Sequence, residues 1–309
     1  MKSEIRMQNS EFRNFRSKSP ISRNFLLHAP LNLVTRNSEF CIRISTFLIL
    51  SLLLVFSKAA LAQAPVMKIG LIADIQYCSC PTAFSREYSK SLEKVEVAVE
   101  AINKDTVNFT VELGDMIDRD FQNFDPVIQR LNTLNNKWIF IPGNHDLSVS
   151  RSLKKKVLDR IPAEKGYWSE VIDDLRLVYL NGFVKKVAGW NGALGRNQLA
   201  WIISEVDKAN QSHQKLIVFA HQLIVPGDSH SLLESQKMIE ILSGSQHMVL
   251  YICGHKHSGS DHTIGNIRIL NLKGMVEAKK PSFAVLSIYP DRWVLKGYGE
   301  QESIAGGLK

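Results

Sequence analysis

Five strand-like stretches of this chain each end in side chains that can bind metal ions. Each stretch is apolar and β-prone, and aspartate, asparagine, glutamine or histidine follows it. Because loops at the carboxyl ends of strands converge on one crevice in α/β folds, we expect these side chains to meet. Their oxygen and nitrogen atoms suit two hard or borderline divalent cations, which points to metal-assisted phosphoryl chemistry. The side chains are Asp74 and Gln76 after 68–73, Asp115 after 107–113, Asn144, His145 and Asp146 after 137–142, His221 after 216–220, and His255 and His257 after 248–253.

The segments between these groups predict the elements that position them. Strands alternating with amphipathic helices, then a run of antiparallel strands, predict an α/β fold: a sandwich of two mixed β-sheets flanked by helices. The charges at 90–104 and at Lys154–Lys156 are expected to form solvated faces. The expected helices cover 89–104, 124–135, 196–209 and 229–243, a hairpin joins 168–172 to 175–180, and further strands cover 267–272, 282–289 and 292–297.

In this order, the five groups resemble the calcineurin-like metallophosphoesterase superfamily. The pattern is Asp-x-Gln, Gly-Asp, Gly-Asn-His-Asp, a histidine after a strand, and Gly-His-x-His, and the resemblance covers 67–297. Finer features resemble the manganese-dependent ADP-ribose/CDP-alcohol diphosphatases within that superfamily. These features are glutamine at position 76, where most of the superfamily has histidine, and the runs at 195–201, 274–278 and 295–299.

The resemblance implies a role for each candidate side chain. Asp115 resembles the carboxylate that bridges two ions, and two dications beside two aspartates leave positive charge that binds phosphate and lowers the pKa of water. Asp74, Gln76 and His257 would complete the first ion's ligands, and Asn144, His221 and His255 those of the second.

Gln76 affects the choice of metal. An amide oxygen in place of an imidazole makes the site harder and favours Mn²⁺ or Mg²⁺ over Zn²⁺ or Fe. We therefore expect Mn²⁺ to support the highest activity.

The resemblance also assigns a catalytic role to His145 and Asp146. His145 would face the phosphate and either protonate the leaving oxygen or stabilise developing charge. Asp146 would hold the His145 ring in the required tautomer.

Other polar and aromatic residues lack comparable context, so we expect structural roles for them. Asp118 follows Asp115 closely and is expected to be a solvated loop carboxylate or a residue that supports the ligands. The remaining residues of this kind are His213, His230, His247 and His262, expected to be non-ligands, and Trp168, Trp190 and Trp201, expected in the core or the pocket wall.

The N-terminal segment has the order of features found in secretory signal peptides. Basic residues precede an uncharged, Leu-rich run at 45–57, and Ala60-Leu61-Ala62 follows it. We predict a leader at 1–62 that is cleaved after Ala62, leaving a secreted or periplasmic protein without stable membrane association. A single-span membrane anchor is the alternative, although 13 residues fall short of the ~20 that cross a bilayer.

Removing this leader changes the charge argument. The whole chain has a formal net charge of +8, but residues 63–309 hold 29 Lys/Arg and 27 Asp/Glu. This small excess does not support a nucleic-acid-binding module. The 247 remaining residues suffice for one large metallophosphoesterase domain.

Three cysteines remain after the leader. Cys253 is expected to be a small buried hydrophobic residue at a strand end. For Cys78 and Cys80 a disulfide or a thiolate near the metals stays open.

The substrate is the least defined part of the function. The resemblance implies a nucleoside diphosphate linked to an alcohol or sugar, cleaved at its phosphoanhydride. The stretch between Tyr77 and Glu93 lacks much of the family's arginine-rich insertion but keeps Arg86. An exported broad-specificity phosphodiesterase or phosphomonoesterase, and a non-catalytic metal-binding scaffold of the same fold, are the alternatives.

Overall fold

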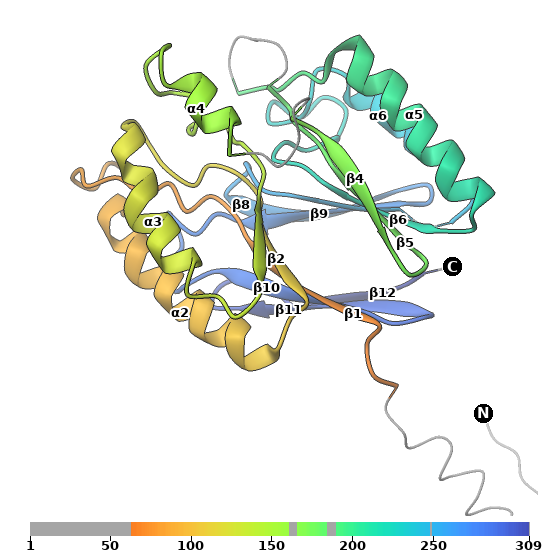
Figure 1. Cartoon of the computed structure of the whole chain (residues 1–309), viewed down its shortest axis with the longest axis horizontal. Coiled ribbons are helices and arrows are strands. Elements are labelled where there is room, and N and C mark those ends of the chain that lie inside the picture. The colour runs from red at the N-terminus through yellow and green to blue at the C-terminus, as the bar shows by residue number, and fades with distance from the viewer. Residues whose placement is uncertain (1–62, 161–165, 184–189, 248, 309) are drawn as a thin grey trace, which may run out of the picture. The chain divides into compact units, whose positions relative to one another are not determined.

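Two β-sheets lie face to face in the part of the chain that the structure describes (Figure 1). This computed structural model describes residues 63–308 except 161–165, 184–189 and 248, so the expected leader at 1–62 lies outside the described residues. Within them, no helix has the length and apolar character needed to cross a membrane.

The first sheet combines parallel and antiparallel strands in the order β12-β11-β10-β1-β2-β3. Strands β1, β2 and β3 run parallel, whereas β10 pairs antiparallel with both β1 and β11. The bounds are β1 Met67–Ile72, β2 Phe109–Glu112, β3 Lys137–Phe140, β10 Phe283–Ile288, β11 Arg292–Tyr298 and β12 Ile304–Gly307.

The second sheet is also mixed, in the order β4-β5-β6-β7-β9-β8. Strands β5, β6, β7 and β9 run parallel, and β4 and β8 pair antiparallel at the two edges. The bounds are β4 Trp168–Ile172, β5 Leu175–Tyr179, β6 Lys215–Phe219, β7 Val249–Cys253, β8 Ser258–Ile264 and β9 Ile267–Lys273.

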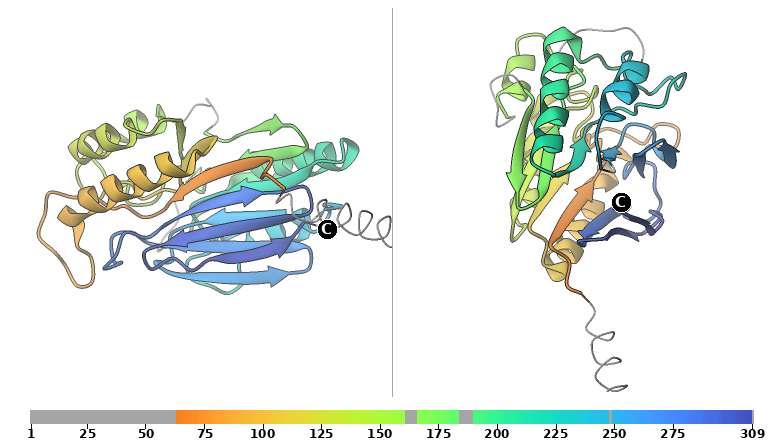
Figure 2. Two further views of the ribbon diagram at one scale, coloured as in Figure 1. Left: turned by 90° about the horizontal axis from the view of Figure 1, so that it is seen from below. Right: turned by 90° about the vertical axis from the view of Figure 1, so that its right-hand side faces the viewer.

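Helices cover the outer face of each sheet, as Figures 1 and 2 show. The apolar faces of α2 (Ser91–Asp105) and α3 (Phe124–Leu131) pack on the first sheet, and those of α5 (Gly195–Gln211) and α6 (Ser235–Leu242) on the second. A third apolar cluster fills the space between the sheets and includes Leu71, Val111, Phe219 and Ile252, all at most 1% exposed. Burying each such side chain stabilises the fold by about 1.5–3 kcal/mol. The described part also contains α4 (Lys154–Leu158) and 3₁₀ turns at Tyr88–Lys90 and Phe121–Asn123.

The predicted fold class and the five ligand-bearing strands are confirmed, with local differences. The helix expected at 229–243 begins only at Ser235, because the preceding residues form a loop with its own polar contacts. Strand β8 was not predicted, since its Ser-Gly-Ser-Asp-His sequence is polar and lies at a sheet edge. Strand β12, with two glycines among its four residues, gave no strand pattern either.

Candidate metal centre

The candidate ligands follow the carboxyl ends of five parallel strands. Asp74 and Gln76 follow β1, Asp115 follows β2, and Asn144 follows β3, all in the first sheet. The second sheet contributes His221 after β6, and His255 and His257 after β7. The centre therefore lies where the two sheets meet.

The backbone at these strand ends adopts left-handed conformations that are uncommon for residues with a side chain. Asp74, Gln76, Asp115 and His255 have φ values of 53°, 42°, 59° and 74°. Such conformations cost about 1–3 kcal/mol each and persist where the surrounding structure holds them, often at functional sites.

Glycines next to the ligands permit their close approach. A Cβ atom on Gly143 would overlap the carboxylate of Asp115, and one on Gly114 would lie 2.6 Å from His221 Nδ1. The Gly-Asp and Gly-Asn-His-Asp patterns thus have a steric basis.

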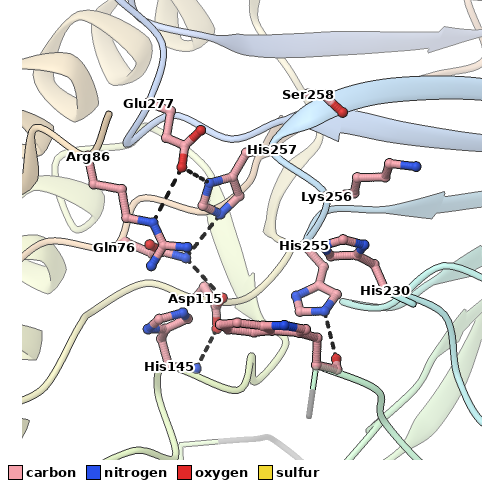
Figure 3. Close-up of a pocket in the computed structure, with 11 residues that line it drawn as sticks. Gln76, Arg86, Asp115, His145, His230, His255, Lys256, His257, Ser258 and Glu277 are labelled. Carbon is pink, nitrogen blue, oxygen red and sulfur yellow. Dashed lines mark hydrogen bonds and ion pairs between the residues drawn. The ribbon is translucent and has the colours of Figure 1, made fainter. Parts of the chain in front are cut away.

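Asp115 occupies the middle of the cluster (Figure 3). Its Oδ2 atom lies 3.1 Å from Gln76 Nε2 and 3.3 Å from His221 Nε2, so it contacts both expected ligand sets. The backbone N–H of His145 donates to its other oxygen at 2.7 Å. Possible ligand atoms of Asp115, His221 and His255 all lie within 4.8 Å of one another, and all three residues are buried.

The first expected ligand set is assembled around His257. His257 Nε2 lies 3.5 Å from Asp74 Oδ1 and 3.1 Å from Gln76 Nε2. The Oε1 atom of Gln76 is buried without a hydrogen-bond partner among the described residues. Turning the amide group by 180° would place this oxygen, which can bind a cation, beside Asp115 and His257, where the nitrogen now lies.

The second expected set is equally close. Asn144 Oδ1 lies 3.3 Å from His221 Nε2, and the rings of His221 and His255 have centroids 4.7 Å apart. The structure therefore brings together all seven side chains that the sequence proposed as metal ligands.

Acceptors outside the cluster fix the orientation of the three histidines. One ring nitrogen of each lies within hydrogen-bond distance of an oxygen, which leaves the other nitrogen available for a metal. The contacts are His221 Nδ1 to the Leu113 carbonyl at 2.8 Å, His255 Nε2 to the Trp190 carbonyl at 2.7 Å, and His257 Nδ1 to Glu277 Oε1 at 3.0 Å.

Without metal, protons stabilise the negative charge of the cluster. Burial lowers the pKa of His221, but Asp115 outweighs it and raises that pKa to about 9. Burial likewise opposes the charge on His257, whereas Asp74 and Glu277 raise its pKa to about 10. Burial and the charge on His221 lower the pKa of His255 to about 3. The rings of His221 and His257 therefore hold protons near neutral pH at positions where cations would bind.

The expected partner of the His145 ring was wrong. Asp118 Oδ1, not Asp146, lies 3.0 Å from His145 Nδ1. Burial lowers the pKa of His145, but Asp115 and Asp118 together raise it above its ordinary value. Asp118 was expected to be either a solvated loop carboxylate or a residue that supports the ligands. Its contact with the His145 ring fits a supporting role.

Asp146 instead holds the backbone of the ligand loops. Its fully buried carboxylate accepts the N–H groups of Asp115 at 2.9 Å, Gly143 at 2.8 Å and Ile117 at 3.1 Å. Three backbone donors converge on this carboxylate, so its side chain faces away from the ring of its sequence neighbour His145. Burial and the nearby charge of Asp115 raise its pKa to about 7.

A cleft of about 300 Å³ opens over the cluster. Several of its lining residues had not been proposed for the site, and His230 and Trp190 had been given structural roles. Trp190 forms part of the wall, as expected, and is 52% exposed. Glu277 lies in one of the runs that resemble the diphosphatases, and Lys256 stands between two candidate ligands, so both had a sequence signal. The residues added to the predicted ones are Arg86, His230, Lys256, Ser258 and Glu277.

The cysteines lie in two different environments. Cys78 and Cys80 form a disulfide close to Gln76 in the sequence. Cys253 is a buried free thiol at the end of β7, as expected.

With this geometry established, a comparison with known families identifies the fold. A family described as calcineurin-like phosphoesterase matches residues 67–259. The chain belongs to this family. It is a metal-dependent phosphoester hydrolase, as the order of its ligand groups predicted.

Known members of the family resemble the chain over most of its length. Manganese-dependent ADP-ribose/CDP-alcohol diphosphatases from Mus musculus and Danio rerio are 24% and 23% identical to it. The matches cover 80% and 78% of this chain, and 94% and 98% of those proteins. The crystal structure of a dimetal phosphatase from Danio rerio matches with a TM-score of 0.69 and 21% identity, over 79% of this chain and 100% of that one.

Proposed function

We propose that this phosphoesterase is an exported diphosphatase that uses two Mn²⁺ ions. Its substrate would be a nucleoside diphosphate linked to a sugar or an alcohol, cleaved at the phosphoanhydride. The observation that carries the proposal is the position of Asp115 Oδ2, 3.1 Å from Gln76 and 3.3 Å from His221. A carboxylate between two ligand sets is what a two-ion centre requires.

The residues present fit such ions. Asp74, Gln76, Asp115 and His257 would hold the first, and Asp115, Asn144, His221 and His255 the second. When bound, the ions would neutralise phosphate charge and lower the pKa of water toward neutrality. The amide oxygen of Gln76 makes the first position harder than an imidazole would, which favours Mn²⁺ or Mg²⁺ over Zn²⁺ or Fe.

Residues of the chain would position and protonate the substrate. His145 lies in the cleft with Nδ1 against the carboxylate of Asp118, a contact that favours a ring that carries a proton. It could donate to the leaving oxygen or stabilise charge that develops on the phosphoryl group. Arg86 and Lys256 add positive charge on opposite sides of the cluster in Figure 3.

The substrate class rests on the names of the relatives and on the charge of the chain. The mouse and zebrafish proteins are named for ADP-ribose and CDP-alcohols. Residues 63–309 hold 29 Lys/Arg against 27 Asp/Glu, which favours a small phosphorylated molecule over nucleic acid.

A substrate panel tests this proposal. Purified protein with added Mn²⁺ would be assayed with ADP-ribose, CDP-choline, a bis-aryl phosphate and an aryl monophosphate. Higher kcat/KM for the two diphosphates would support it. Preference for the bis-aryl phosphate or the monophosphate would favour the broad-specificity alternatives, and no hydrolysis of any substrate would favour a scaffold.

Export is a separate part of the proposal. The signal-peptide pattern before Ala62 supports it, and the Cys78–Cys80 disulfide suits an oxidising compartment. Sequencing the N-terminus of the protein from its native source should give a start at or near Gln63. A start well before residue 58 would contradict cleavage.

A further inference from the structure

Lys94 is buried against the loop at 274–278, although its place among the charges of α2 predicted a solvated side chain. It is 5% exposed, and its ammonium group contacts three carbonyl oxygens of one loop. Nζ lies 3.1 Å from the Met275 carbonyl, 3.3 Å from that of Val276 and 2.6 Å from that of Ala278. Three N–H donors thus face three carbonyl acceptors, and the carboxylate of Glu87 lies 3.6 Å from Nζ. The carbonyls and this carboxylate together compensate the burial of the charge.

The loop that Lys94 holds also contacts the first ligand set. Its N–H groups at Met275 and Val276 donate to the carbonyls of Ala73 and Asp74, both at 3.0 Å. The N–H of Gly274 donates to the carbonyl of His257, also at 3.0 Å. The loop therefore connects the backbones of two candidate ligands, Asp74 and His257.

Glu277 lies within the residues that Lys94 fixes. Its Oε1 atom is 3.0 Å from His257 Nδ1 and 3.4 Å from Arg86 Nε (Figure 3). The contact with Nδ1 leaves His257 Nε2 directed at Asp74 and Gln76. Because Lys94 contacts the carbonyls before and after Glu277, the backbone position of Glu277 depends on the ammonium group.

We propose that Lys94 is a positioning residue for the first metal ion and acts through Glu277 on His257. This inference rests on the two-ion centre proposed above. Residues that orient a metal-binding histidine from outside the ligand set commonly change metal affinity 10–100-fold when they are removed. The second ion would be held by Asn144, His221 and His255 together with Asp115, and none of these residues lies on this loop.

The test measures Mn²⁺ affinity at both positions by calorimetry of the metal-free protein. Lys94→Met keeps the length and apolar stem of the side chain but removes all three donors. We expect this variant to lower the affinity for one Mn²⁺ ion by about 10–100-fold and to change the affinity for the other by less than about threefold. Lys94→Gln, which keeps amide donors, should fall between wild type and Lys94→Met. It also serves as the test variant if Lys94→Met does not fold.

Two further variants show whether the effect passes through Glu277. Glu277→Ala should lower the affinity for the same Mn²⁺ ion. Adding Lys94→Met to this variant should lower that affinity little further, because both changes act on the orientation of His257 through Glu277. Lys104→Met removes an exposed lysine of the same helix and is the matched control, with both affinities unchanged.

The outcomes separate this inference from the proposed function. Wild-type protein that binds fewer than two Mn²⁺ would contradict the two-ion centre itself. If wild-type protein binds two Mn²⁺ ions, three results would overturn the role of Lys94. These are equal weakening of both Mn²⁺ affinities in Lys94→Met, unchanged affinities in both Lys94 variants, and additive effects of Lys94→Met and Glu277→Ala.

Discussion

His145 Nδ1 lies 3.0 Å from Asp118 Oδ1, although the two residues are 27 positions apart in the chain. The family resemblance implied this contact for Asp146, which adjoins His145 in the chain. Adjacent residues in a tight loop point in different directions, and Asp146 points at three backbone N–H groups. Residue types and order predicted which side chains gather, but contacts between separate loops depend on backbone turns that spacing does not encode.

His145 should contribute to turnover and not to metal binding. We expect His145→Ala to lower kcat about 10²–10⁴-fold, because a positioned proton donor supplies an effect of that size. Asp118→Asn should lower kcat about 10–100-fold, since it weakens the orientation of the ring. The measurement is kcat on the best substrate of the panel, with metal content by elemental analysis. Loss of metal from His145→Ala would make His145 a ligand.

Asp146→Asn provides the contrasting variant. The amide offers one acceptor oxygen where the carboxylate accepts three backbone N–H groups. We therefore expect a lower melting temperature together with reduced metal content. A selective fall in kcat with normal stability would instead support the role first expected for Asp146.

Gln76 permits a test of metal preference at a single position. Gln76→His replaces the buried amide oxygen, which has no hydrogen-bond partner in the described part of the chain, with a softer nitrogen ligand. The ratio of activity with Zn²⁺ to activity with Mn²⁺ should rise, by an expected factor of at least ~10. The ratio would be measured after reconstituting metal-free protein with each ion. An unchanged ratio, or wild-type protein that already works best with Zn²⁺, would contradict this account of Gln76.

At the scale of elements, the sequence predicted best where burial imposes a repeating pattern. Four of the ligand-bearing strands, β1, β2, β6 and β7, lie in sheet interiors, and their apolar runs identified them. Strand β3 lies at the edge of the first sheet, but its last two residues are buried and apolar, so its run was recognisable too. Edge strands such as β8 face solvent and carry a weaker pattern. Lys94 shows the same limit within a helix, because its burial depends on the loop at 275–278, about 180 residues away.

Strand β2 ends in a carboxyl group, that of Glu112, that should reduce stability as pH rises above ~4.5. Burial, and then the nearby charge of Asp146, raise the pKa of Glu112 well above its ordinary value. The unfolded chain releases this proton above pH ~4.5 while the folded chain retains it, so stability is fully present below that pH and is lost as pH rises.

Glu112→Gln removes this titrating group and keeps an oxygen for the N–H of Gly114, which Glu112 accepts at 3.2 Å. We expect the free energy of unfolding of the metal-free variant to fall less between pH 5 and pH 8 than that of wild type. One pKa unit corresponds to about 1.4 kcal/mol, so the difference should reach at least that size. Urea unfolding at both pH values measures it. Equal losses in the two proteins would show that Glu112 titrates normally.

At the scale of the molecule, the candidate metal centre joins the two sheets. Asp74, Gln76, Asp115 and Asn144 follow strands of the first sheet, and the three histidines follow strands of the second. Ions bound there would connect loops of both sheets and stabilise the folded state in proportion to their affinity and concentration. Metal binding should therefore be linked both to folding and to the protons that the metal-free centre retains.

This linkage gives a prediction with a defined sign. In the metal-free protein, neighbouring carboxylates outweigh burial and raise the pKa of His221 to about 9 and that of His257 to about 10. Both rings are therefore protonated at pH 7, and each must lose its proton before its free nitrogen binds a metal. Mn²⁺ binding at pH 7 should release about two protons, and Mn²⁺ affinity should rise with pH until these groups have titrated. Calorimetry in buffers of different ionisation enthalpy counts the protons, since each one released protonates a buffer molecule. Binding heats that do not depend on the buffer at pH 7 would show that His221 and His257 are already neutral, and would remove the proposed competition between protons and metal.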